Sequence, residues 1–266
     1  MDLRFSEAEL DRVREGIVSF VDEQVAAAGA DGAVIGLSGG IDSSLVAHLA
    51  VEALGPGRVR GLVMPGTVSD PDNTSDGEAI AEKLGIEYDV VPIESVVDAL
   101  VTGLPEVADD RVAVGNARAR VRGVFNYLVA NHEDRLVLGT GNRSEALAGY
   151  YTKYGDQAVD CNPIGDLYKT QVRQLARAVG LPERIVAKPP TAGLWEGQTD
   201  EDELGVSYET LDTVLALHVD GSLSAAATVR ELGVDPEVVD RVRDLYVANE
   251  HKRRMPPAPG LDIVEG

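Results

Sequence analysis

A segment rich in glycine and hydroxyl side chains follows an apolar run near the start of the chain. The apolar run, residues 33–37, is typical of a strand buried on both faces, and a helical pattern follows the segment. The segment reads Ser38-Gly39-Gly40-Ile41-Asp42-Ser43-Ser44. Glycines let a backbone approach an anion closely, and a helix N-terminus directs unpaired N–H groups at it. This pattern predicts a loop that binds an oligophosphate. The simpler alternative is a turn whose Asp and Ser side chains only cap the helix.

Asp42 indicates that a cation accompanies the phosphates. A carboxylate beside phosphates repels them unless a cation lies between the two groups. Mg²⁺ prefers carboxylate and phosphate oxygens as ligands, so it fits this position better than other cations. The sequence therefore predicts Asp42 as a Mg²⁺ ligand beside the bound phosphates.

Strands that alternate with helices must position this loop. Capping-box residues Ser6 and Glu9 begin an amphipathic helix, and strands are predicted at 33–37, 59–64, 87–91 and 136–138. Ser75 with Glu78 predicts the start of the helix that stops at Gly85. The remainder is predicted to be helical at 207–219, at 224–232 and from the Asp235-Pro236 cap onward.

This alternation predicts an α/β fold with a doubly wound parallel sheet, Rossmann-like, and a helical C-terminal part. Ligands of such sheets bind beyond the C-terminal ends of the strands. Both the loop at residue 38 and the stretch after residue 138 fall there. The polar loops 65–73 and 188–205 are long enough to cover a ligand.

Composition limits the class of protein. The 266 residues and 28.2 kDa suit a single domain, 1–266, and 44% apolar residues are enough for a substantial core. No apolar run is long enough for a transmembrane helix, and the N-terminus lacks the pattern of an export signal, so a cytoplasmic protein without a membrane partner is expected. One cysteine, Cys161, excludes an internal disulfide framework and a cysteine-based zinc site.

The charge balance is strongly acidic. Asp and Glu number 45 against 24 Lys and Arg, which gives a net charge of −21. Nucleic-acid binding is not expected, because phosphate contacts need clustered Lys and Arg. The acidic residues are dispersed along the chain, which favours a halophilic surface that high salt makes tolerable. An ordinary acidic enzyme that gains solubility from its charge is the alternative.

The loop at 38–44 resembles the pyrophosphate-binding loop of the N-type ATP pyrophosphatases. It is not a Walker motif, because no Gly-Lys-Ser/Thr follows it. The resemblance implies the adenine nucleotide alpha hydrolase type of fold. It also implies cleavage of ATP between the α and β phosphates, with adenylation of a carboxylate, amide or carbonyl oxygen.

A second block resembles the core signature of the NAD synthetases. Residues 136–170 read LVLGTGNRSEALAGYYTKYGDQAVDCNPIGDLYKT. Smaller pieces agree in the family's order: Gly115-Asn116, Ala119-Arg120, Pro190-Thr191-Ala192, Asp202-Glu203-Leu204-Gly205 and His251-Lys252-Arg253. On these motifs the chain is identified as a member of the NAD synthetase family from about residue 7 to 257.

The resemblance implies a role for each matching residue. Those implied to bind ATP are Gly36, Leu37, Ser38, Gly39, Gly40, Ile41, Asp42, Ser43, Thr140, Lys169 and Thr191. Those implied to contact the deamido-NAD substrate are Arg120, Lys153, Asp160, His251 and Lys252. The implied Mg²⁺ ligands are Asp42 and Glu145. One departure stands at 140–143, Thr-Gly-Asn-Arg, where many bacterial members have Thr-Asp-His/Asn, which leaves the roles of Asn142 and Arg143 open.

The implied activity is the last step of NAD biosynthesis. Deamido-NAD is amidated with ammonia at the expense of ATP, through an acyl-adenylate, to give NAD, AMP and pyrophosphate; no residue acts as a covalent nucleophile. Ammonia is expected to be used directly, because glutamine-dependent relatives carry a separate glutaminase domain and Cys161 lies within the synthetase block. The resemblance also implies a homodimer with the dinucleotide near the interface.

Interpretations without a binding role stay open for several of these residues. The arginines Arg111, Arg118, Arg120 and Arg122 are also compatible with a solvated basic face. Another ATP pyrophosphatase, such as a tRNA-thiolating enzyme or GMP synthetase, is the alternative enzyme. A non-catalytic module that binds an adenine nucleotide is the alternative of another class, but it would not need Glu145, Lys153 and Lys169.

Overall fold

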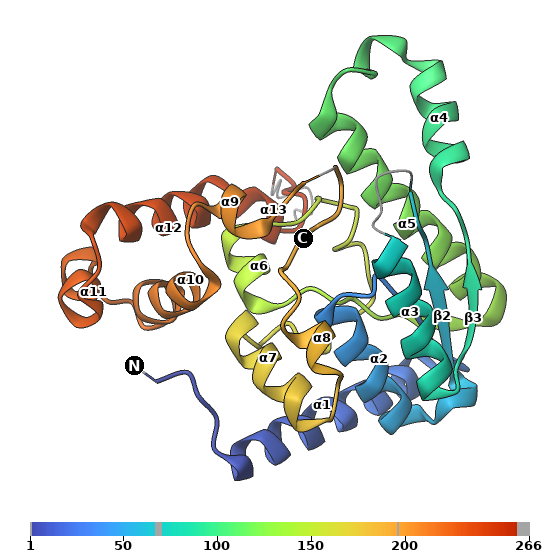
Figure 1. Cartoon of the computed structure of the whole chain (residues 1–266), viewed down its shortest axis with the longest axis horizontal. Helices are drawn as coiled ribbons and strands as arrows, with labels where there is room; N and C mark the ends of the chain where they lie inside the picture. Colours follow the sequence, from blue (N-terminus) through green and yellow to red (C-terminus); the bar gives the residue numbers. More distant parts are fainter. Residues whose placement is uncertain (1, 67–70, 196, 260–266) are drawn as a thin grey trace, which may run out of the picture.

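Four parallel strands form the sheet at the centre of the molecule (Figure 1). The computed structural model describes residues 2–66, 71–195 and 197–259. The strands are β1 (Gly32–Gly36), β2 (Val59–Val63), β3 (Glu87–Val90) and β4 (Arg135–Val137), in the order β3-β2-β1-β4. Val34 of β1 pairs with Arg60 on one side and with Val137 on the other. The strand order therefore reverses between β1 and β4, which makes this the topological switch point where ligands of such sheets bind.

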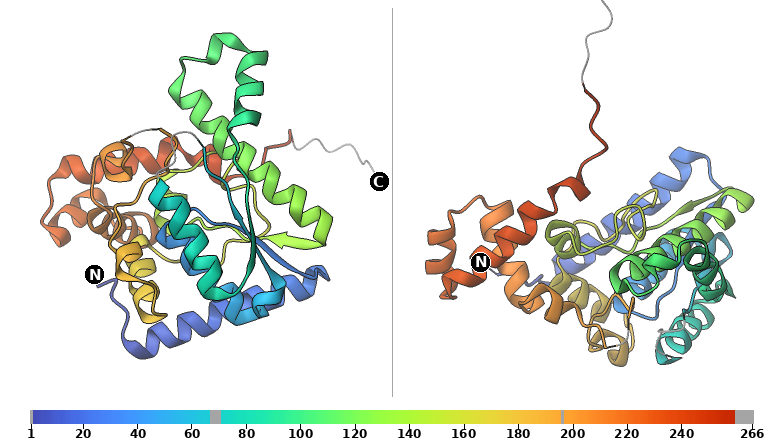
Figure 2. Two further views of the ribbon diagram at one scale, coloured as in Figure 1. Left: turned by 45° about the vertical axis from the view of Figure 1, so that its right-hand side comes forward. Right: turned by 90° about the horizontal axis from the view of Figure 1, so that it is seen from above.

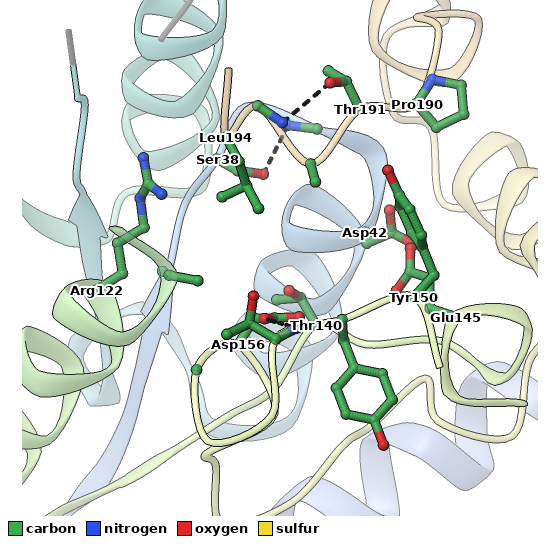
Figure 3. A pocket seen from close by; sticks show the side chains of 18 of the residues that line it. Ser38, Asp42, Arg122, Thr140, Glu145, Tyr150, Asp156, Pro190, Thr191 and Leu194 are labelled. Carbon is green, nitrogen blue, oxygen red and sulfur yellow. Dashed lines mark hydrogen bonds between the residues drawn. The ribbon is translucent and has the colours of Figure 1, made fainter. Parts of the chain in front are cut away.

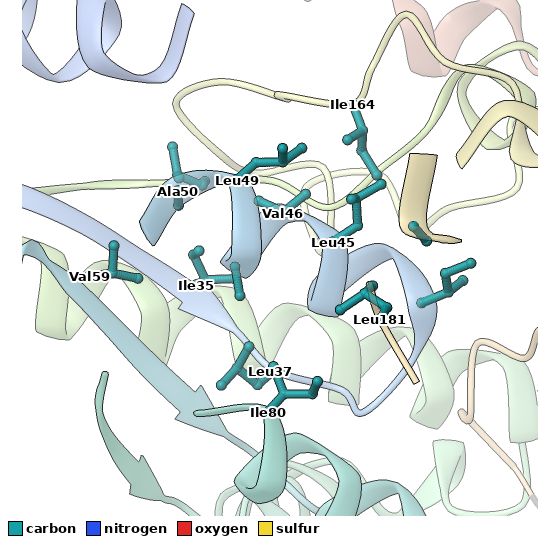
Figure 4. Close-up of a cluster of buried hydrophobic side chains, with 14 of the residues drawn as sticks. Ile35, Leu37, Leu45, Val46, Leu49, Ala50, Val59, Ile80, Ile164 and Leu181 are labelled. Atoms are coloured by element: carbon teal, nitrogen blue, oxygen red, sulfur yellow. The ribbon is translucent and has the colours of Figure 1, made fainter. Parts of the chain in front are cut away.

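Helices cover both faces of the sheet, as a doubly wound fold requires (Figure 2). One core cluster joins β1 and β2 to α1 (Glu7–Ala28), α2 (Ile41–Leu54), α3 (Pro71–Leu84), α7 (Lys169–Ala178) and α8 (Glu183–Val186). Ile35, Leu45 and Leu49 lie at its centre (Figure 4). A second cluster joins the opposite face to α4 (Glu94–Gly103) and α5 (Arg111–Glu133). β1 and β2 are largely apolar because both of their faces are buried in this way, whereas the edge strand β3 is mostly exposed.

Residues 200–253 form a helical unit around a third core cluster. It contains α9 (Asp200–Leu204), α10 (Tyr208–Val214), the π-helix η3 (Leu215–Asp220), α11 (Ala225–Leu232), α12 (Pro236–Ala248) and α13 (Glu250–Arg253). The short helix α6 (Arg143–Ala148) packs against α10 and α12. Two 3₁₀ turns, η1 (Pro56–Arg58) and η2 (Pro105–Val107), complete the elements. None of the described helices is both long and apolar enough to cross a bilayer.

Most of the predicted elements are confirmed, and one predicted helix start is wrong. The capping box of Ser6 and Glu9, the strands, and the caps at Ser224 and Asp235 are present. Helix α3, in contrast, begins at Pro71, so Ser75 lies inside it and caps nothing. Proline suits the first turn of a helix, where its missing N–H has no partner to lose. The predicted loop 65–73 is shortened accordingly, and its residues 67–70 lie outside the described residues.

Candidate active site

A cavity of about 500 Å³ opens beyond the C-terminal ends of β1 and β2 (Figure 3). Most of its walls come from five parts of the chain: the loop before α2, the residues after β2, α5, the stretch 149–159, and the loop 188–195. The stretch 138–140 after β4 forms the floor between them. The cavity thus lies at the switch point, where the predicted phosphate loop and the residues after β4 meet.

The loop 38–44 wraps around the N-terminus of α2. Ser38 Oγ accepts a hydrogen bond from Gly40 N, and Ser43 Oγ accepts one from Ser38 N, both at 3.2 Å. Gly39 has a φ of 74°, and a Cβ there would lie 2.1 Å from the carbonyl oxygen of Asn73. No other residue fits that position, because both the conformation and the close approach require glycine. The 14-residue helix α2 therefore begins at a tightly shaped turn that suits an anion.

Three charged side chains from distant parts of the chain meet beside this loop. Lys169 Nζ lies 2.5 Å from Asp42 Oδ2 and 3.4 Å from Glu145 Oε1. The lysine side chain is 3% exposed and the two carboxylates are 17% and 18% exposed. Burial works against the charge of the ammonium, but the two carboxylates outweigh it and raise the pKa of Lys169 above its ordinary value. Lys169 is therefore a permanent cation between two predicted metal ligands.

Glu145 is the carboxyl group of this trio that keeps its proton most readily. Burial raises the pKa of Glu145 to about 8; Lys169 opposes the shift, and Asp42 adds to it. A further cation at this place would favour the ionised form of Glu145 and so lower its pKa.

This shift predicts how the stability of the protein depends on pH. The folded pKa of Glu145, about 8, exceeds its ordinary 4.5, so between these pH values the folded state binds more protons than the unfolded state. The free energy of unfolding that Glu145 contributes therefore falls as pH rises through this window. We expect Glu145→Gln to remove this loss, so that at pH 8.5 the variant is more stable than the wild type by on the order of 2 kcal/mol, while at pH 5 the two are similar.

Urea unfolding of both proteins at several pH values measures this difference. Glutamine keeps the acceptor that the capping box of α6 uses, so the helix start is preserved. Parallel pH profiles of the two proteins would contradict the raised pKa of Glu145.

Asp200 is a cavity residue that sequence analysis did not identify. The residue is 3% exposed and accepts a hydrogen bond from the Tyr208 hydroxyl at 2.9 Å, and among the described residues its Oδ1 has no partner. Burial raises the pKa of Asp200, with Lys169 opposing. The sequence held one signal for this residue: Thr199, a helix-capping residue, precedes an acidic run, and α9 begins there at Asp200.

Arg122 also lines the cavity, and the interpretation of the arginines as a solvated face is wrong for this residue. Its Nε donates to the carbonyl oxygen of Met64 at 3.1 Å, and the guanidinium stands beside the cavity (Figure 3). Burial, with Arg118 adding to it, lowers the pKa of Arg122 to about 10, which still leaves a cation at neutral pH. Arg118 itself pairs with Glu94 at 3.0 Å.

Of the other predicted ligand-binding residues, several line the cavity and others do not. Those that line it are Gly36, Leu37, Ser38, Gly40, Ile41, Thr140, Thr191 and Lys252. Gly39 and Ser43 support the loop from behind, as the contacts above describe. The residues predicted to contact deamido-NAD that lie outside the cavity are Arg120, Lys153, Asp160 and His251.

These outer residues make contacts of their own. Arg120 donates to the carbonyl oxygen of Lys153 at 3.2 Å, and Lys153 Nζ donates to that of His251 at 2.9 Å. Asp160 accepts from Val137 N at 2.7 Å and from the Tyr127 hydroxyl at 3.1 Å, which ties it to the edge of the sheet. Within one chain these four residues are thus not brought into the cavity with Lys252.

The donor set around Asp42 fits a magnesium ion. Two carboxylates lie within reach of one cation, and carboxylate oxygens are hard ligands of the kind that Mg²⁺ takes. Among the described residues, no group of three or more His, Cys, Asp or Glu side chains is placed to hold a metal alone. Mg²⁺ commonly completes its coordination with waters and substrate phosphates, so this limited donor set matches an ion that arrives with a nucleotide.

The chain has a parallel sheet, and a loop shaped by glycine lies at its switch point beside buried carboxylates and a lysine. These features define a nucleotide-binding α/β protein. The comparisons identify the family within this class. The NAD synthase family model matches residues 13–256. The NH(3)-dependent NAD(+) synthetase of Halobacterium salinarum is 64% identical over 97% of both chains. The chain therefore belongs to the NAD synthase family.

Solved structures agree with this assignment and with the predicted fold. A structure of NMN synthetase from Francisella tularensis has 33% identity and a TM-score of 0.85, covering 97% of this chain and 100% of that one. The NH3-dependent NAD synthetase from Campylobacter jejuni has 32% identity and a TM-score of 0.80, covering 94% and 98%. The doubly wound fold of the adenine nucleotide alpha hydrolase type is thereby confirmed.

Proposed function

We propose that this chain makes NAD from deamido-NAD, ATP and ammonia, with AMP and pyrophosphate as the other products, in the final step of NAD biosynthesis. The observation that carries the proposal is the group of Asp42, Glu145 and Lys169 at the mouth of a phosphate loop. The names of the relatives support the same reaction, since relatives that match 97% of the chain are NH(3)-dependent NAD(+) synthetases.

The first step joins two anions, and the cavity supplies the charges that this requires. A carboxylate oxygen of the substrate attacks the α-phosphorus of ATP, the bond to the β-phosphate oxygen breaks, and pyrophosphate leaves. The loop and the N-terminus of α2 hold the phosphates, while Lys169 and Thr191 face them. Arg122 and Lys252 add positive charge to the lining of the cavity. Because one cavity holds both substrates, the carboxylate and the phosphates meet in a fixed orientation and not by a random encounter of like charges.

The second step releases the product. Ammonia attacks the carbonyl carbon of the adenylate, the bond to the AMP oxygen breaks, and one proton is released. No side chain of this chain need form a covalent bond. The adenylate is sensitive to water, so the loop 188–195 that covers the cavity has a protective function as well as a binding one.

Asp42 and Glu145 would hold a Mg²⁺ ion that accompanies ATP. When bound, the ion neutralises the phosphate charge and polarises the reacting phosphorus. Lys169, which contacts both carboxylates, keeps them together when no metal is bound.

Arg120, Lys153, Asp160 and His251 would contact deamido-NAD where a second copy of the chain completes the site. Arg120 precedes Val124 and Leu128 at four-residue spacing on α5, so the three lie along one face of this helix. Val124 and Leu128 are 66% and 62% exposed, which leaves an apolar strip uncovered in the single chain. We propose a homodimer in which a second copy covers this strip, because the strip continues directly from a predicted substrate contact.

The dimer is tested with a charged substitution in this strip. We expect light scattering to give twice the 28.2 kDa mass for the wild type and the single-chain mass for Leu128→Asp. The matched control is Val247→Asp on α12, which is 60% exposed and far along the chain from α5. A wild-type monomer with full activity would contradict the dimer.

The function itself is tested by product analysis. Purified protein with ATP, Mg²⁺ and deamido-NAD is expected to release AMP, pyrophosphate and NAD in equal amounts when ammonium is added. Nicotinate mononucleotide in place of deamido-NAD tests the alternative that the similarity to the NMN synthetase of Francisella tularensis suggests. Faster amidation of the mononucleotide would overturn the proposed substrate but not the reaction.

Glutamine replaces ammonium in the last arm of this assay. Burial raises the pKa of Cys161 to about 11, so its thiol is protonated at neutral pH and a poor nucleophile. We expect no activity with ammonia-free glutamine, and equal ammonium-driven rates for the wild type and Cys161→Ser. Glutamine-driven synthesis that Cys161→Ser abolishes would contradict direct use of ammonia.

The location and the domain organisation of the chain are proposed on separate grounds. A cytoplasmic location is proposed because ATP is consumed. A single working unit, residues 1–266, is proposed because α13 returns to the cavity, where Lys252 Nζ donates to the carbonyl oxygens of Gly149 and Tyr151 at 2.6 and 3.0 Å.

A further inference from the structure

Asn142 is buried between the two carboxylates that the proposed function assigns to the metal. Its side chain is 0% exposed. It stands at the N-cap of α6, and its Oδ1 accepts a hydrogen bond from Glu145 N at 3.0 Å. Its Nδ2 donates to Asp42 Oδ1 at 3.0 Å, across 100 positions of sequence. A residue that only capped a helix would not need this second contact.

The hydrogen bonds around the two carboxylates follow one pattern. Asp42 directs Oδ2 at Lys169 and Oδ1 at the amide of Asn142. Glu145 directs Oε1 at Lys169 and Oε2 at the backbone N of Asn142, at 3.2 Å. Each carboxylate therefore has one oxygen held by Lys169 and the other held by Asn142. Two fixed oxygens define the orientation of a carboxylate, whereas one leaves it free to rotate.

The chemistry of a primary amide suits this position. An amide carries an acceptor for the helix N–H and a donor for Asp42 on the same planar group, without adding charge. A serine keeps the acceptor at the N-cap, but its hydroxyl lies too near the backbone to replace the amide donor to Asp42. An aspartate would lack the donor and would place a third acidic group beside Asp42 and Glu145, whose mutual repulsion already favours the protonated form of one of them.

The first turn of α6 also fixes the lysine. Ser144 Oγ accepts a hydrogen bond from Lys169 N at 2.8 Å and donates to Asp212 Oδ1 at 2.5 Å. Ser144 and Asp212 are both 0% exposed. The start of α7, which carries Lys169, is thereby attached to the same turn that carries Asn142 and Glu145.

We propose that Asn142 is a positioning residue, which orients Asp42 and Glu145 toward a shared cation through the two hydrogen bonds it donates. The inference rests on the proposed function, since the cation it names is the metal that accompanies ATP. Asn142 itself touches neither substrate nor metal; it acts through the two carboxylates.

The test separates positioning from helix capping. Asn142→Ser keeps the cap and removes the donor to Asp42, whereas Asn142→Ala removes both. Ser224→Ala is the matched control, because Ser224 caps the remote helix α11 through Ala227 N. Each protein is loaded with α,β-methylene-ATP, which cannot be cleaved at the bond in question, and Mn²⁺ binding is measured by electron paramagnetic resonance. The midpoint of thermal unfolding and the separate values of kcat and KM are measured alongside.

We expect Asn142→Ser to melt close to the wild type, yet to bind Mn²⁺ about 10- to 100-fold more weakly, the loss typical when an outer partner of a metal ligand is removed. Its kcat is expected to fall by a similar factor, with little change in KM for deamido-NAD. Asn142→Ala is expected to lose Mn²⁺ affinity and also to melt earlier. Ser224→Ala is expected to melt earlier and to bind Mn²⁺ as the wild type does.

Two outcomes would overturn the inference in different ways. If Asn142→Ser has the Mn²⁺ affinity and the kcat of the wild type, Asn142 acts only as a helix cap, and the proposed function is unaffected. A wild type that forms NAD but binds no Mn²⁺ with the nucleotide would remove the metal site from the proposed function, and the inference with it.

Discussion

Asp42→Asn is expected to lower the rate of pyrophosphate release by on the order of 10²–10³-fold while the protein stays folded. The amide keeps the volume of the side chain but loses the charge that faces Lys169 at 2.5 Å and that would hold the metal of ATP. Pyrophosphate release at saturating Mg²⁺, with deamido-NAD and ammonium present, measures the loss. Thermal unfolding checks that the fold is intact.

Two comparisons show whether the loss belongs to this site. Glu106→Gln changes an exposed carboxyl in η2, and it is expected to react at the wild-type rate. Glu145→Gln is expected to be impaired as Asp42→Asn is, and the double variant is expected to lose less than the sum of the two effects, because both carboxylates serve one bound nucleotide. Unchanged turnover of Asp42→Asn at saturating Mg²⁺ would contradict the metal assignment.

Lys169→Met is expected to cost about 3–5 kcal/mol of stability at pH 7.5, in addition to activity. Lys169 is the cation that contacts Asp42 and Glu145, and it also lowers the pKa of Asp200 against the effect of burial. Methionine fills the space but leaves these buried carboxylates uncompensated, so part of their charge must be lost by protonation. Urea unfolding at several pH values measures the loss, which should shrink as pH falls and the carboxylates protonate.

Lys83→Met serves as the control for loss of a lysine. Lys83 is exposed and its ammonium donates to the carbonyl oxygen of Gly180 at 3.3 Å, so little change in stability is expected. A Lys169→Met protein as stable as the wild type at pH 7.5 would contradict the role of Lys169 as the cation that pairs with Asp42 and lowers the pKa of Glu145 and Asp200 against the effect of burial.

Local patterns in the sequence predicted the elements well because each depends on nearby residues. The apolar runs at β1 and β2 and the caps at Ser6, Ser224 and Asp235 are readable within a few positions. The start of α3 was missed for the same local reason: a Ser–Glu pair inside a helix has the pattern of a capping box, and Pro71 was the stronger signal.

The residues themselves predicted the phosphate loop and Asp42, and the resemblance supplied the rest of the predicted site. Asp42, Glu145 and Lys169 are separated by more than 20 positions from one another, and no local pattern indicates that they meet. Asn142 and Asp200 depend on contacts across the fold, with Asp42 and with Tyr208. Arg120 and Asp160 show the opposite limit, since the resemblance predicts substrate contacts for them, whereas within one chain they lie outside the cavity.

The most direct test of the proposed reaction follows the oxygen atoms of the substrate. Deamido-NAD labelled with ¹⁸O in its nicotinate carboxylate is incubated with the protein, ATP, Mg²⁺ and ammonium, and the products are analysed by mass spectrometry. Attack of the carboxylate on the α-phosphorus requires that each NAD formed be matched by one AMP carrying one ¹⁸O, with unlabelled pyrophosphate. Unlabelled AMP, or label in inorganic phosphate beside ADP, would contradict the acyl-adenylate route.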